Sequence, residues 1–133
     1  MKKENVEFIG LFNEENWLHI TLKYYGVSPL VNRESIELFK NLIGKEFHIS
    51  LIGHGEYEKD GVILNKGYLV DKDSLSFPII PEVPHITTYV NIKKGGKAKD
   101  TKLCVFKALD TPIIMKMRLG VCRFGKIEYT LED

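Results

Sequence analysis

The sequence predicts an α+β fold with antiparallel sheet. Several segments alternate apolar and polar residues as half-buried strands do, and one segment between them has apolar residues at helical spacing. The chain has 133 residues, which is enough to bury one core and too short for two ordinary domains. We therefore expect residues 1–133 to form a single domain.

The first strand is predicted over residues 17–24. Its apolar residues fall on every second position, so they share one face of the strand. The other face then carries Trp17, His19, Thr21 and Lys23. Because the apolar face is expected to pack on a core, this polar face is left free for function.

The same alternation recurs over residues 84–91 and predicts a second strand. His85, Thr87 and Tyr89 share one face, and apolar or β-branched residues occupy the other. The two strands thus have one design, with a histidine and a threonine two positions apart on the polar face.

A helix is predicted between these strands. Asn32 is a suitable N-cap, apolar residues follow at helical spacing, and Gly44 is a typical end. A hairpin is predicted from strands at 47–52 and 61–70, and further strands are expected near 113–117 and 120–130.

Three segments are predicted to lack regular strands. Residues 71–84 contain three prolines and should be irregular, and residues 101–109 should form a short helical or irregular stretch. Residues 93–100 form a loop rich in glycine and lysine. Its backbone N–H groups and Lys97 could contact a phosphate, although a solvated loop is an equally plain interpretation.

The overall composition argues against several classes of protein. The 19 basic and 18 acidic residues leave a net charge of +1, too small for a protein that coats long nucleic acid. No apolar run is long enough to span a membrane, and the first residues do not resemble a signal segment, so we expect a cytosolic protein. Cys104 and Cys122 are expected to be free thiols rather than a disulfide.

The two His-x-Thr triplets carry the chemical hypothesis. One neutral imidazole can take a proton from the attacking group while a second, protonated imidazole gives one to the leaving oxygen. A threonine on the same face can donate its hydroxyl to a phosphate oxygen on which charge develops. The sequence therefore suggests His19, Thr21, His85 and Thr87 as a catalytic set for phosphodiester cleavage without a metal or other cofactor.

The residues 18–22 (LHITL) and 84–87 (PHIT) resemble the two signatures of the 2H phosphoesterase superfamily. The order of the motifs and the basic loop after the second are similar to its compact members. These include RNA-repair cyclic phosphodiesterase domains and phage anti-CBASS nucleases, which cut cyclic oligonucleotide signals. The resemblance implies a bilobal α+β fold with antiparallel sheets lining a central groove, catalysis by His19 and His85, and phosphate contacts from Thr21 and Thr87. Thr88 departs from the leucine that is frequent in the second motif.

Aromatic and basic residues near the triplets are candidates for substrate binding. Trp17 and Tyr89 could stack nucleobases, and Lys23 and Lys97 could meet phosphates. Other aromatic residues near the first triplet, such as Phe8 and Phe12, are expected to be mainly core. His48 and His54 lack partners at the spacing of a metal site.

Three functions stay open at this point. The first is hydrolysis of a cyclic oligonucleotide, the second is 2′,3′-cyclic phosphodiesterase activity in RNA repair or end processing, and the third is nucleotide binding without turnover. The expected partner is a nucleotide rather than a membrane or a long duplex. The pattern does not assign the acid and base roles to particular histidines.

Overall fold

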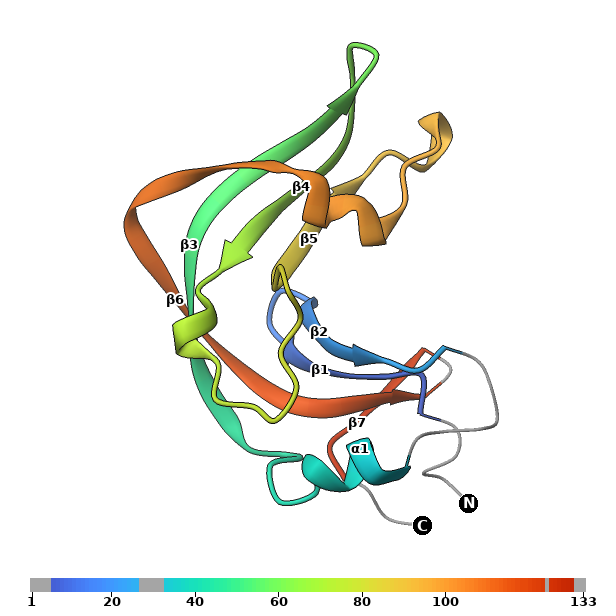
Figure 1. Ribbon diagram of the computed structural model, residues 1–133, viewed down its shortest axis with the longest axis vertical. Helices are drawn as coiled ribbons and strands as arrows, with labels where there is room; N and C mark the ends of the chain where they lie inside the picture. The colour runs from blue at the N-terminus through green and yellow to red at the C-terminus, as the bar shows by residue number, and fades with distance from the viewer. Residues whose placement is uncertain (1–5, 27–32, 124, 131–133) are drawn as a thin grey trace.

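The computed structural model describes residues 6–26, 33–123 and 125–130, with the side chains of 33–35 left out (Figure 1). Its strands belong to one sheet, with the order β2-β1-β6-β3-β4-β5 and with β7 paired to β6. The bounds are β1 Phe8–Asn13, β2 Leu18–Tyr24, β3 Glu46–Lys59, β4 Val62–Val70, β5 His85–Val90, β6 Val105–Arg123 and β7 Lys126–Glu128. All neighbouring strands are antiparallel.

The predicted α+β bilobal fold is wrong. The molecule is mostly β, with 56% strand against 13% helix, and one strongly curved, nearly closed sheet takes the place of separate lobes. The described helical segments are the single α-helix α1 (Arg33–Leu38) and the 3₁₀ turns η2 (Lys72–Ser74), η3 (Ile92–Lys94) and η4 (Ala98–Leu103). None is long enough to form a layer over the sheet.

The helix predicted up to Gly44 ends instead at Leu38. Beyond Leu38 the chain forms turns, and the Gly44 N–H donates to the carbonyl oxygen of Leu119 on β6 at 2.7 Å. Ile36 and Phe39 are nevertheless fully buried, as their spacing predicted. The proposed N-cap, Asn32, lies outside the described residues.

The strand predictions differ from the structure at residue 52, where the first strand of the predicted hairpin was expected to end, and over residues 105–123. β3 continues through Gly55, because a side chain there would meet the Phe106 Cα of β6 at 2.8 Å. The glycine permits close approach of the strands rather than a turn. The strands expected near 113–117 and 120–130 are largely one strand, β6, which begins at Val105, and β1 was not predicted at all.

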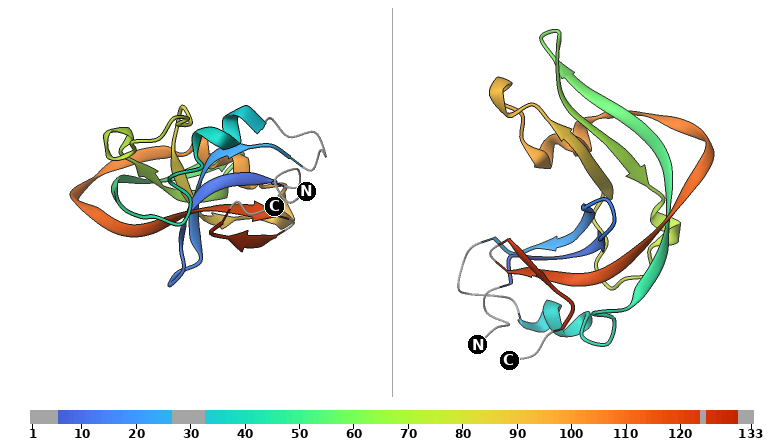
Figure 2. Two further views of the ribbon diagram at one scale, coloured as in Figure 1. Left: turned by 90° about the horizontal axis from the view of Figure 1, so that it is seen from below. Right: turned by 180° about the vertical axis from the view of Figure 1, so that it is seen from behind.

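The sheet is bent where β6 leaves its ladder with β3. Leu51 pairs with Ile113, but Gly53 pairs with Ala108, so residues 109–112 have no partners on β3. An insertion of this kind sharpens the bend of a strand, and β6 sweeps widely at this point in both views (Figures 1 and 2). The curvature brings β2 and β5, the two ends of the strand order, into contact.

The core packs residues of the sheet together with Ile36 of α1 and Phe39 just after it. Alternate residues of β2 point into the core, as expected for a half-buried strand, whereas residues 9–13 of β1 are all buried. The fully buried members of the core include Ile9, Leu11, Ile20, Ile49, Ile86 and Leu119. Both cysteines are buried and free, as predicted. Within the part of the chain that the structure describes, no helix has the length and apolar character needed to cross a membrane.

Candidate functional site

The two His-x-Thr triplets meet where the ends of the sheet come together. His19 and Thr21 lie on β2, and His85 and Thr87 lie on β5. These strands contact each other although they are the first and last in the sheet order. The charge of His85 is one of the causes that lower the pKa of His19. The tertiary structure therefore brings together the four residues that the sequence singled out.

Each site threonine lies opposite a glycine on the neighbouring strand. Thr21 pairs with Gly10 of β1, and Thr87 pairs with Gly67 of β4. Directly paired residues of antiparallel strands present their side chains on the same face. Both threonines therefore lie beside a position that has no side chain, and there the neighbouring chain approaches closely. A Cβ at Gly10 would meet the Ile20 carbonyl oxygen, and one at Gly67 would meet the Ile86 carbonyl oxygen.

A register shift follows each threonine, and it changes the interpretation of two candidates. Leu22 is the extra residue on β2 and Thr88 is the extra residue on β5. Beyond these bulges, strict alternation no longer holds. Alternation by itself therefore no longer supports a shared face for Lys23 with Thr21, or for Tyr89 with Thr87.

Strand pairing gives the cross-strand neighbours of Lys23 and Tyr89. Lys23 pairs with Ile9, which is fully buried on the core face. Tyr89 pairs with Lys66, whose Nζ lies 5.7 Å from the centre of the Tyr89 ring. Lys66 in turn forms an ion pair with Glu56.

His19 lies among aromatic rings. Its ring centre is 5.4 Å from that of Phe8 and 6.0 Å from that of Phe12, and it stacks on Phe12 with an interplanar angle of 24°. Desolvation by these surroundings, and then the charge of His85, lower the pKa of His19 below its ordinary value. The lowered pKa favours the neutral imidazole at pH 7, and the side chain is exposed and so accessible.

His85 is held by a hydrogen bond rather than by rings. Its Nδ1 lies 2.8 Å from the carbonyl oxygen of Val83. A carbonyl can only accept, so Nδ1 carries the hydrogen and Nε2 is the nitrogen that can gain or lose a proton.

The Thr87 hydroxyl belongs to a buried hydrogen-bond network. Its Oγ1 lies 2.8 Å from Oγ1 of Thr101 and 3.4 Å from the carbonyl oxygen of Ala98. The Asn65 amide donates to Thr101 Oγ1 at 3.1 Å and to the Lys97 carbonyl oxygen at 2.8 Å. Asn65 and Thr101 are fully buried.

This network fastens the basic loop beside the second triplet. Lys97 and Ala98 accept hydrogen bonds through their carbonyl oxygens, and Thr101 lies on η4. The Lys97 side chain is exposed. The loop that the sequence suggested as a phosphate contact is thus anchored by its backbone next to Thr87.

Sequence reasoning missed four residues that shape this site. Gly10 and Gly67 carried a usable signal, because an isolated glycine inside a strand marks a close approach or a bulge. Asn65 and Thr101 carried none, since only the fold brings them to Thr87. His54 packs on Tyr68, with ring centres 4.9 Å apart, and the described ranges contain no cluster of three or more His, Cys, Asp or Glu residues that could hold a metal ion.

Comparisons with known proteins add no relative to this picture. Neither the protein-family models, nor the curated proteins, nor the solved structures contain a match to this chain.

Proposed function

We propose that this protein is a metal-independent phosphodiesterase that hydrolyses a nucleotide phosphodiester. The observation that carries the proposal is the meeting of β2 and β5, which brings two His-x-Thr triplets to one place from opposite ends of the sheet. Two histidines and two threonines supply a proton acceptor, a proton donor and hydroxyl donors for phosphate oxygens.

The surroundings of the histidines support different roles. His19, with its lowered pKa, is the base that takes a proton from the attacking water. The water oxygen forms the new bond to phosphorus as the bond to the leaving oxygen breaks. His85, supported by the Val83 carbonyl, gives its Nε2 proton to that leaving oxygen. Exchange with solvent then returns both rings to their starting states.

The threonines are proposed to bind the non-bridging oxygens. In the structure, Thr87 donates to Thr101 Oγ1 at 2.8 Å and to the Ala98 carbonyl oxygen at 3.4 Å. Because Asn65 also donates to Thr101 Oγ1, rotation of both hydroxyls on substrate binding would let the Thr101 hydrogen turn to the Thr87 oxygen. In that arrangement the Thr87 hydrogen is free to bond a phosphate oxygen. Thr101 is then a positioning residue that acts through Thr87.

The substrate that we favour is a cyclic oligonucleotide, and the reaction is placed in the cytoplasm. A reducing compartment agrees with two buried cysteines that remain free thiols. The rival substrate is a 2′,3′-cyclic nucleotide end, which needs the same four residues.

The test is a substrate panel in the presence of EDTA. Labelled cyclic dinucleotides, cyclic trinucleotides and 2′,3′-cyclic mononucleotides are incubated with the protein and separated by chromatography. We expect hydrolysis of at least one class by the natural protein and loss of that hydrolysis in His19→Ala and His85→Ala. His48→Ala is the matched control and should retain the activity. Tight binding of unchanged ligand, or normal rates in either variant, would contradict the proposal.

A further inference from the structure

An aromatic cavity opens directly beside His19. It has a volume of about 490 Å³ and is built from β1, β2, β6 and the chain around β7. Its walls include Phe8, Phe12, Trp17, His19, Ile127 and Tyr129. None of the described residues of β3, β4 or β5 lines the cavity. The cavity therefore belongs to one side of the candidate site.

Trp17 stands at this cavity in an unusual conformation. Its side chain is 82% exposed, so packing does not account for its presence. Its φ is 56°, in the left-handed region that bulky residues rarely adopt. Asp60 has a similar φ of 53°, but it precedes Gly61 in a tight hairpin, where a short polar residue tolerates that region. A strained, exposed tryptophan is more typical of a binding site than of a turn.

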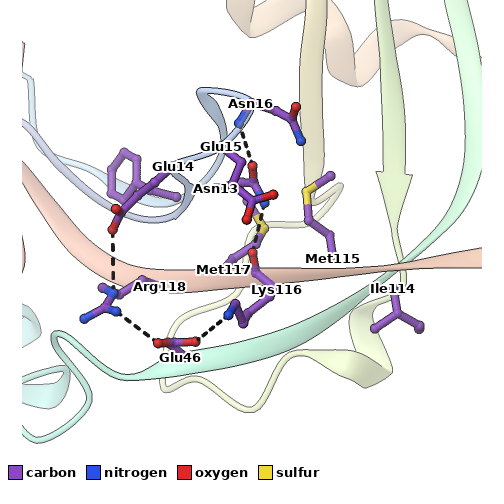
Figure 3. Close-up of a pocket in the computed structure, with 11 residues that line it drawn as sticks. Asn13, Glu14, Glu15, Asn16, Glu46, Ile114, Met115, Lys116, Met117 and Arg118 are labelled. Atoms are coloured by element: carbon purple, nitrogen blue, oxygen red, sulfur yellow. Dashed lines mark hydrogen bonds and ion pairs between the residues drawn. The ribbon is translucent and has the colours of Figure 1, made fainter.

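The hairpin that carries Trp17 is held by a buried asparagine. Asn13 is only 9% exposed, its amide donates to the Lys116 carbonyl oxygen at 3.0 Å, and its Oδ1 accepts from the Asn16 N–H at 2.8 Å (Figure 3). On this side of the hairpin, Arg118 forms ion pairs with Glu14 and Glu46. The loop is thus fixed before any ligand arrives, which lowers the entropy cost of binding.

Tyr129 forms a further aromatic wall. Burial, and then a hydrogen bond with Glu14, raise the pKa of Tyr129 to about 12, so its phenol stays protonated. The ring packs edge-on against Phe12, with centres 6.5 Å apart. The Arg118 guanidinium lies 5.3 Å from the Tyr129 ring centre and holds it from the other side.

We propose that this cavity binds a nucleobase of the substrate, on the His19 side of the scissile phosphate. The inference rests on the proposed phosphodiesterase function. A planar heterocycle suits walls made of aromatic rings, and such stacking tolerates every base. The shared wall at His19 joins the base site to the reacting phosphate. The substrate is therefore a nucleotide recognised through its base, and a phosphodiester that lacks a base is bound poorly.

Tryptophan fluorescence tests this directly, because the chain contains one tryptophan. The His85→Ala variant, which should not turn ligand over, is titrated with the 2′,3′-cyclic phosphates of adenosine, guanosine, uridine and cytidine, with cyclic di-adenosine monophosphate, and with ribose 5-phosphate. We expect saturable quenching of Trp17 by at least one ligand that carries a base, and none by ribose 5-phosphate. Equal effects of all ligands, or no quenching, would overturn the base site.

A second measurement separates a binding role from a structural one. Trp17→Gly removes the ring and relieves the left-handed strain, so the melting temperature should be unchanged or raised. Calorimetric titration should show base-dependent affinity weakened by about 5- to 100-fold, the usual range for loss of one stacking partner. Tyr24→Ala, at an exposed aromatic residue of β2, is the control and should keep the affinity. A large fall in melting temperature, or unchanged affinity in Trp17→Gly, would contradict the inference.

The two proposals can fail separately. Base-dependent quenching without hydrolysis of any ligand by the natural protein would support the base site and remove the phosphodiesterase. Hydrolysis without base-dependent quenching would support the phosphodiesterase and remove the base site.

Discussion

Thr21 lies opposite Gly10 and Thr87 lies opposite Gly67, and in both cases a register shift follows the threonine. The two halves of the site thus share one backbone plan. What fills the space beside each glycine differs. A side chain at Gly10 would approach the Phe8 ring at 3.3 Å, whereas one at Gly67 would meet the methyl group of Thr101 at 2.5 Å.

This difference divides the site into an aromatic half and a hydrogen-bonded half. The ring cluster beside Gly10 desolvates His19 and lowers its pKa. The polar network beside Gly67 orients the Thr87 hydroxyl, and the Val83 carbonyl orients His85. Two similar strands can therefore supply opposite proton-transfer roles, because a side chain's chemistry depends on its neighbours as well as its identity.

The largest expected effect is the loss of turnover in the two histidine variants, compared between a substrate with a poor leaving group and one with a good leaving group. His85→Ala should lower turnover of an ordinary nucleotide by about 10² to 10⁴, but much less for a 4-nitrophenyl ester, whose leaving oxygen needs no proton. His19→Ala should lower both rates by a similar large factor. Steady-state kinetics on the two esters measures this contrast. The opposite pattern would exchange the roles of the two halves.

The shared backbone plan is tested at the glycines. Gly10→Ala places a methyl carbon 2.5 Å from the Ile20 carbonyl oxygen, and Gly67→Ala brings one against the Ile86 carbonyl oxygen and Thr101. Each should lower the free energy of unfolding by about 1–3 kcal/mol, as overpacking does. Urea denaturation measures the loss, and Thr88→Ala, at an exposed residue, is the control. Wild-type stability in both variants would show that close approach at these positions is not required.

A smaller effect is expected at Thr101. Thr101→Val removes one hydrogen bond to Thr87 and should reduce kcat by about 2- to 10-fold, whereas Thr101→Ser should retain most of the rate. If Thr101 acts through Thr87, the double variant Thr87→Val/Thr101→Val should be no slower than Thr87→Val alone. Multiplicative losses would instead indicate an independent role. Denaturation curves of all the variants show whether folding has changed.

The smallest effect concerns the titration of His19. In His85→Gln the neighbouring positive charge is gone, so the His19 pKa should rise. It should remain below its ordinary value, because desolvation is the larger cause and is retained. NMR titration of the His19 ring protons, in the natural protein and in His85→Gln, measures the two pKa values. A pKa that stays constant or falls would show that the two imidazoles are not coupled.

The lowered pKa of His19 also predicts how kcat/KM falls on the acid side of the pH profile. A base must be deprotonated to act, and a lowered pKa keeps the ring neutral to lower pH. In the natural protein, kcat/KM should therefore persist below the pH of about 6.5 at which an ordinary histidine becomes protonated. A limb at or above that pH would contradict the assignment of His19 as the base.

The sequence alone determined the location and faces of the two strands that carry the His-x-Thr triplets. Alternation over 17–24 and 84–91 predicted β2 and β5 to within a residue or two, with His19 and His85 away from the core. This prediction succeeded because burial alternates along a strand, so neighbouring residues in the sequence are enough to show it. The same rule does not extend to Lys23 and Tyr89, because each follows a bulge and a bulge depends on the partner strand.

Only the tertiary structure decided how these strands meet and what surrounds them. Curvature at residues 109–112 brings the first and last strands of the sheet together, and no local pattern shows that closure. Asn65 and Thr101 reach Thr87, and Phe8 and Phe12 reach His19, from distant or unpredicted segments. The histidine and threonine side chains set the available chemistry. Long-range packing sets the solvation and hydrogen bonding of each imidazole, and the proposed roles of the two histidines follow from that difference.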